Sequence, residues 1–123
     1  MPTQAQQILE AAGKDIDGMV AMGVVGMDGI HIAQVKSGDI SAEAQENYGV
    51  KFALVMSLVR KSLAEIKLPD LEENLVEHGG GWVLSRFIGD TNFYLGLAVS
   101  KDAVLGNVRM VAKKTAEKLA EVL

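Results

Sequence analysis

The sequence predicts an α/β fold, a three-layer sandwich built on a five-stranded, mainly antiparallel sheet. Two segments, Met19–Met27 and Phe93–Val99, are apolar at both alternating positions, as in strands that are buried on both faces. Segments with the 3.6-residue periodicity of helices precede, separate and follow them, in the order helix-strand-strand-helix-strand-strand-strand-helix. No internal repeat, low-complexity segment or linker interrupts the 123 residues, so we expect a single domain over residues 1–123.

The first three elements are a helix and a hairpin. Thr3–Lys14 has the pattern of a short amphipathic helix, because its apolar residues share one stripe. Asp28-Gly29 is the strongest hairpin signal in the chain, and it joins Met19–Met27 to an antiparallel return strand at Ile30–Val35. A polar loop, Lys36–Ile40, then leads to the next helix.

The longest element is a helix from Ser41 to Ile66. Ser41 is suited to the N-cap, Glu43 complements the dipole in the first turn, and Pro69 prevents continuation. At ~1.5 Å per residue this helix is ~40 Å long, whereas a domain of this size has a radius of gyration of only ~14 Å. It should therefore cross the whole molecule.

The fifth element, Leu71–His78, is a charged strand. Its acidic and amide side chains do not suit the middle of a buried sheet, so we place it at an edge. The three glycines at 79–81 turn the chain into a strand at Trp82–Ile88. They do not form a phosphate-binding loop, because a strand follows them and no lysine is present.

The last strand and helix complete the sandwich. In Phe93–Val99, Gly96 and Ala98 share a face with Tyr94 and leave room for a helix to approach closely. Asp102 is the expected cap of a final helix, Ala103–Val122. The apolar positions of that helix form a single stripe: Val104, Val108, Val111, Thr115, Leu119 and Val122.

The long helix is apolar on two faces, whereas a surface helix of a monomer needs only one. One stripe should face the core: Tyr48, Phe52, Val55, Met56, Val59, Leu63 and Ile66. The opposite stripe, which Lys61 borders, has residues at the helical offsets 0, 3, 4, 7 and 8. These residues are Val50, Ala53, Leu54, Ser57 and Leu58. We interpret this second stripe as a dimer or partner interface, against the alternative of scattered surface apolar residues.

The edge strand supplies a neighbouring part of the same interface. Pairing of two such strands about a twofold axis would use Leu71, Glu73, Leu75 and Glu77, and would bring two long helices side by side. The alternative is that its charges prevent strand pairing.

Composition and motifs argue against catalysis and against several partners. A net charge of −4 and a pI near 5.1 exclude broad phosphate binding, so we expect no nucleic-acid partner. His31 and His78 lie on separate strands without a ligand set, and Ser57 and Ser62 have no general base, so we expect no catalytic residue, no metal and no cofactor. We therefore expect that the protein is not an enzyme.

The sequence also favours a cytoplasmic location. There is no cysteine, the start is polar and without the basic region of a signal peptide, and the longest apolar run, Met19–Met27, is about half of a membrane span. We expect no membrane insertion.

The chain resembles the roadblock/dynein light-chain family over nearly its whole length. The resemblance rests on the element order, on the hairpin Gly23–Ala33 (GVVGMDGIHIA) and on Asn92–Leu119, where an apolar strand runs into a helix start with Leu105, Gly106 and Arg109. It implies a dimer with edge strands joined into one sheet and long helices adjacent. It also implies a regulator or scaffold of a small Ras-like GTPase, similar to bacterial homodimeric members that act as GTPase-activating partners.

In those members the GTPase supplies the catalytic groups, so the resemblance implies no catalytic residue here. Arg60 and Arg86 are candidates for an arginine finger, a device that the family does not generally use. Two other functions stay open: a dimeric adaptor subunit of a motor or signalling assembly without a nucleotide-dependent role, and a ligand-sensing domain with an internal pocket.

Overall fold

The computed structural model describes residues 3–37 and 40–123, and it contains the predicted elements in the predicted order. Gly38 and Asp39 of the predicted loop lie outside the described residues. The elements are α1 (Gln4–Gly13), β1 (Met19–Gly26), β2 (His31–Lys36), α2 (Ala42–Glu65), β3 (Glu73–His78), β4 (Gly81–Phe87), β5 (Phe93–Ser100) and α3 (Leu105–Val122).

The five strands form one sheet in the order β2-β1-β5-β4-β3, with every neighbouring pair antiparallel. The two strands that are apolar on both faces, β1 and β5, lie inside the sheet, and the charged strand β3 lies at an edge. The three glycines after β3 make its turn into β4. The predicted fold class is therefore confirmed, including the hairpin interpretation of the glycines.

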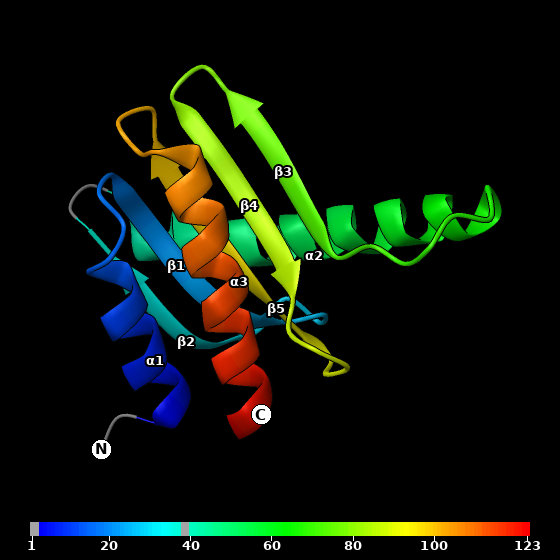
Figure 1. The fold of residues 1–123 in the computed structure, drawn as a ribbon, viewed down its shortest axis with the longest axis horizontal. Helices are drawn as coiled ribbons and strands as arrows, with labels where there is room; N and C mark the ends of the chain where they lie inside the picture. Colours follow the sequence, from blue (N-terminus) through cyan, green and yellow to red (C-terminus); the bar gives the residue numbers. More distant parts are fainter. Residues whose placement is uncertain (1–2, 38–39) are drawn as a thin grey trace.

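Helices cover both faces of the sheet (Figure 1). Helices α1 and α3 lie on one face over the larger core, whose fully buried side chains include Leu9, Met22, Leu95 and Leu119. Helix α2 crosses the other face over a smaller core and projects past β3, so its last turns have no strand beneath them (Figure 1). No helix in the described ranges combines the length and hydropathy needed to span a membrane.

Close approach fixes α2 on the sheet, as predicted for Gly96. A Cβ atom added to Gly96 would lie 2.6 Å from the ring of Tyr48, so only glycine leaves space for that ring. The hydroxyl of Tyr94 donates to the carbonyl of Gly49 at 2.7 Å, and that of Tyr48 donates to the carbonyl of Leu84 at 3.3 Å. Burial raises the pKa of Tyr48 to about 12, so its hydroxyl remains a donor at neutral pH.

The start of α3 differs from the prediction. The helix begins at Leu105, its N-cap is Val104, and no side chain caps it. Asp102 belongs to the preceding turn, where its backbone N–H donates to the Ser100 hydroxyl at 3.3 Å. Val104 is 71% exposed and so does not belong to the buried stripe, because the core face of α3 is centred on small residues, Ala112 and Ala116, that allow close contact with the sheet.

Candidate partner interface

The outward face of α2 carries the predicted apolar stripe. Val50, Leu54 and Leu58 are 46%, 63% and 66% exposed, and Ser57 and Lys61 beside them are also exposed. Three large apolar residues separated by one helical turn each make a continuous strip rather than scattered positions. We call Val50, Leu54, Ser57 and Leu58 the outward stripe.

Two residues of the predicted helix Ser41–Ile66 differ in burial from the prediction. Ala53 is only 3% exposed and packs with Val25, Met56 and Tyr94, so it belongs to the core and not to the outward stripe. The reason is that the contact face is centred on the small residues Gly49 and Ala53, which bring the helix close to the strands. Ile66, predicted in the core, is the C-cap of α2 and is 65% exposed. The last turns of α2 project past β3 (Figure 1), so no strand covers this end of the helix.

Strand β3 presents a free backbone edge. The Phe87 N–H donates to the Glu72 carbonyl at 3.3 Å, so these two residues are a hydrogen-bonded pair. In an antiparallel ladder every second pair is hydrogen-bonded, and this fixes which residues of β3 bond to β4. The backbone groups of Glu73, Leu75 and Glu77 therefore point away from β4. Leu75 is 37% exposed and Glu77 is exposed, whereas Leu71 packs partly against the core beneath α2.

The opposite edge of the sheet is protected by a side chain. The Gln6 amide of α1 donates to the Gln34 carbonyl at 2.9 Å and accepts from the Gln34 N–H at 3.0 Å, as a neighbouring strand would. Within residues 3–37 and 40–123, no side chain bonds the outward backbone groups of β3 in this way. Edge pairing with another chain is thus open at β3 and restricted at β2.

Glu73, which we predicted at the interface, is engaged within the chain. Its carboxylate contacts Arg86 of β4 at 3.3 Å and Arg109 of α3 at 2.8 Å, and its side chain is only 8% exposed. It ties the edge strand to its neighbour and to the covering helix. Its side chain therefore positions β3 and leaves Glu77 as the exposed acid of the strand.

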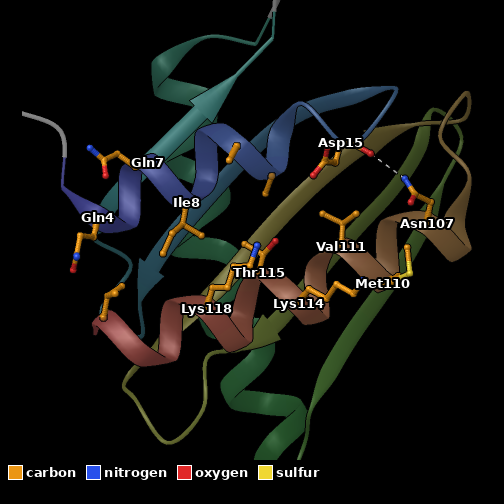
Figure 2. Close-up of a pocket in the computed structure, with 13 residues that line it drawn as sticks. Gln4, Gln7, Ile8, Asp15, Asn107, Met110, Val111, Lys114, Thr115 and Lys118 are labelled. Carbon is orange, nitrogen blue, oxygen red and sulfur yellow. Dashed lines mark hydrogen bonds between the residues drawn. The ribbon is translucent and has the colours of Figure 1, made fainter.

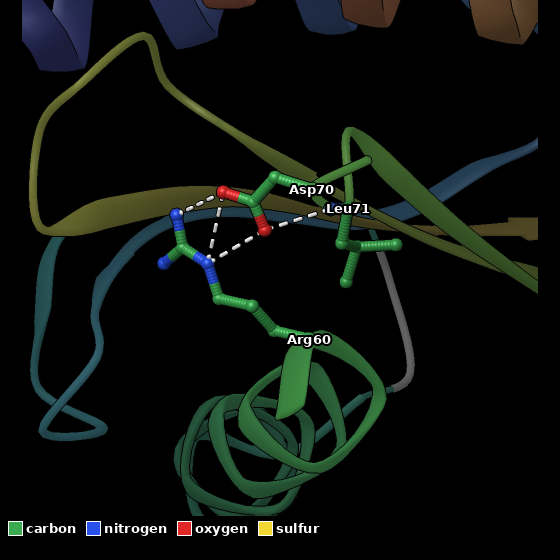
Figure 3. Close-up of polar contacts among 3 residues, drawn as sticks. All are labelled: Arg60, Asp70 and Leu71. Carbon is green, nitrogen blue, oxygen red and sulfur yellow. Dashed lines mark hydrogen bonds and ion pairs between the residues drawn. The ribbon is translucent and has the colours of Figure 1, made fainter. Parts of the chain in front are cut away.

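Arg60 holds the segment that follows α2. Its guanidinium makes a two-pronged contact with Asp70, with distances of 2.9 and 2.7 Å, and lies 4.3 Å from the centroid of the Phe87 ring (Figure 3). Asp70 also accepts from the Leu71 N–H at 2.8 Å. The hydrogen bond to Arg60 holds the pKa of Asp70 below its usual value, and the same contact raises the pKa of Arg60. This clamp sets the path of the chain from α2 into β3.

The ring of His31 lies between β1 and α2. Cβ atoms added to Gly23 or Gly49 would lie 2.8 and 2.4 Å from its ring, so the ring fills the space that these two glycines leave. Burial lowers the pKa of His31, an effect that Glu46 partly opposes. His31 and His78 are on the opposite edge strands, and the described residues hold no group of three metal-ligating side chains.

The buried His31 predicts a pH dependence of stability. The pKa of His31 is lower in the folded chain than in the unfolded one. Its contribution to the free energy of unfolding is therefore complete above about pH 6.5 and is lost as the pH falls through the folded pKa. We expect the urea midpoint to fall between pH 7.5 and 5.5, and to fall less in His31→Gln. Equal losses in both proteins would show that His31 does not cause the effect.

Comparison with known proteins supports the fold and not a sequence family. Neither protein-family models nor curated proteins match the sequence. The chain superimposes on a Roadblock/LC7 domain from Streptomyces avermitilis with a TM-score of 0.85, at 9% identity over 95% of each chain. It matches the gliding protein MglB from Thermus thermophilus with a TM-score of 0.86, at 14% identity over 99% of this chain and 93% of that chain.

A third structure, of MglB in a tetrameric arrangement, gives a TM-score of 0.87 at 15% identity, over 99% of this chain and 92% of that chain. The fold is therefore that of Roadblock/LC7 domains and MglB proteins. The resemblance drawn from the hairpin and the C-terminal segment is confirmed at the level of the fold.

Proposed function

We propose that this protein is a homodimeric regulator or scaffold of a small Ras-like GTPase. The observation that carries the proposal is one surface with two unpartnered features, the outward stripe of α2 and the free edge of β3, on a fold shared with MglB. Pairing of two β3 edges about a twofold axis would extend the sheet across both chains and place the two α2 helices next to each other.

The exposed apolar surface of α2 continues beyond the outward stripe. Beyond Leu58, α2 presents Lys61 and the exposed Ile66, and Leu68 follows it at 52% exposure. A projecting helix with apolar residues and basic neighbours fits a surface against which another protein packs. We infer that one part meets the second copy and that the dimer as a whole presents the rest to the GTPase.

The regulation that we propose needs no catalytic residue from this chain. Both arginines considered as fingers are held by carboxylates of the same chain, Arg60 by Asp70 and Arg86 by Glu73. A finger must reach the charge that develops on the nucleotide, and these contacts would have to break first. The dimer would act by positioning the switch regions of the GTPase.

The function is tested by multiple-turnover GTP hydrolysis by the small Ras-like GTPases of the same cell, with and without the protein. Faster hydrolysis supports an activator, and GTP-dependent binding without acceleration supports a scaffold. Binding that does not depend on the nucleotide bound to the GTPase favours the adaptor function instead. No binding to any GTP-loaded small GTPase of the same cell rejects both the activator and the scaffold role.

The proposed strand pairing predicts a large difference between two substitutions at one position. Leu75→Pro removes an N–H that points away from β4, so it blocks pairing with a second chain while the β4 ladder remains. Leu75→Ala removes the side chain and keeps the N–H. We expect Leu75→Pro to raise the dimer dissociation constant at least about tenfold more than Leu75→Ala, measured by sedimentation equilibrium, since several hydrogen bonds lose their register. Equal effects of the two would reject pairing at this edge.

A further inference from the structure

A groove runs between α1 and α3, on the face of the sheet opposite α2 (Figures 1 and 2). Its volume is about 650 Å³. The two helices run antiparallel, and one end of the groove is closed where the Asn107 amide donates to the Asp15 carbonyl at 3.1 Å (Figure 2). Neither the outward stripe nor β3 contributes to it, so it is a separate surface.

The walls of the groove are apolar and partly exposed. Ile8 and Ala11 line it from α1, and Met110 and Val111 line it from α3. Met110 is 49% exposed, although it lies on the covering helix and has a long apolar side chain. Because the groove is open along one side, a small apolar ligand in it would remain largely exposed to water. An amphipathic helix fits better, because its polar face can remain in water while its apolar face packs into the groove.

The charge of the groove selects the partner. Lys114 and Lys118 lie one helical turn apart along the α3 wall (Figure 2), and neither makes an ion pair within the described part of the chain. Of the charged residues that line the groove, two are basic, Lys114 and Lys118, and one is acidic, Asp15 at the closed end, hence a net charge of +1 in a chain of net charge −4. This positive wall complements acidic side chains spaced by one turn.

We propose that the groove binds an amphipathic helix of a partner protein. The helix would place an apolar stripe against Ile8, Ala11, Met110 and Val111, and acidic side chains four residues apart opposite Lys114 and Lys118. The α1 wall has ten residues and is thus ~15 Å long, so about three turns of helix fill it. The dimer would then hold two such helices on the face away from its own interface.

The test uses two fluorescent 15-residue helical peptides with the same Leu/Ala stripe, one with two glutamates four residues apart beside the stripe and the other with two lysines there. Fluorescence anisotropy measures their binding to the whole protein, to Lys114→Glu/Lys118→Glu, and to the matched control Lys101→Glu/Lys113→Glu. The control has the same change in net charge at exposed lysines that do not line the groove.

We expect the dissociation constants of the glutamate peptide for the unchanged protein and for the control to agree within about twofold. Its affinity for the groove variant should be lower by about tenfold or more at low salt. The lysine peptide should prefer the groove variant. Ala11→Trp, which fills the groove from an exposed position, should also weaken the binding of the glutamate peptide. No binding of the glutamate peptide up to millimolar concentration, or equal losses in both double variants, would overturn the proposal. Neither result bears on dimerisation or on GTP hydrolysis, because we propose both at the outward stripe, the exposed end of α2 and the β3 edge, which do not line the groove.

Discussion

Leu54→Glu combined with Leu58→Glu is expected to convert the proposed dimer into a folded monomer. Both side chains are exposed in the single chain, at 63% and 66%, so the fold should lose at most about 0.5 kcal/mol. In a dimer that buries the outward stripe, two carboxylates per chain would lose water without a partner, at several kcal/mol in total. Light scattering should report 13.1 kDa in place of twice that mass, 26.2 kDa.

Val104→Glu is the matched control for this double substitution. Val104 is 71% exposed and precedes α3, away from the outward stripe, so an apolar-to-glutamate change there should leave the proposed dimer intact. GTPase binding is measured in parallel. If the Leu54/Leu58 variant keeps both the dimer mass and the GTPase affinity, the outward stripe is not an interface.

Met56→Ala is expected to destabilise the fold strongly, whereas Leu58→Ala, two positions along α2, is expected to change it little. Met56 is fully buried between α2 and the sheet with Val25, Ala53 and Tyr94, so its truncation leaves a cavity that costs about 2–5 kcal/mol. Leu58 is 66% exposed in the single chain, and its loss should cost less than about 0.5 kcal/mol.

Urea unfolding of both variants should be measured in the Leu54→Glu background, at a protein concentration where that background is monomeric, so that dissociation does not contribute. Leu54→Glu alone is the reference. The dimer dissociation constant of Leu58→Ala, in the otherwise unchanged chain, should rise although its monomer remains stable. Equal stabilities of the Met56 and Leu58 variants would contradict the assignment of two functionally different faces to this helix.

The sequence predicted the elements well because each has a strong local signal. Asp28-Gly29 and the three glycines at 79–81 mark turns. The two strands that are apolar on both faces, β1 and β5, pair with each other inside the sheet. The outward stripe was also predictable, since a second apolar stripe in a helix is visible in its periodicity.

The prediction failed where tertiary contacts decide. Periodicity assigned Ala53 to the outward stripe, but small residues allow a helix to approach a sheet, and Gly49 and Ala53 bring their own face inward. Ile66 shares the core periodicity but caps the end of α2 that projects past the last strand. The order of strands, which sets where the sheet ends, is not a local property of α2.

The contacts that polar side chains make with distant parts of the chain could not be predicted. Gln6 is an ordinary polar residue of α1 in the sequence, and only the fold brings it beside Gln34. Arg60 and Asp70 are ten positions apart, and their contact depends on the path of the loop after α2. Polar residues on helix surfaces carry no signal that distinguishes such roles.

Exchange of individual backbone amides, followed by NMR at several protein concentrations, tests the proposed dimer most directly. The N–H groups of Leu75 and Glu77 point away from β4, so their protection needs a second chain, whereas that of Val76 is bonded within the sheet. We predict that Leu75 and Glu77 are protected at high concentration and exchange faster on dilution, while Val76 and the Gln6-bonded amide of Gln34 change little. Rapid exchange at Leu75 and Glu77 at every concentration would contradict pairing through β3.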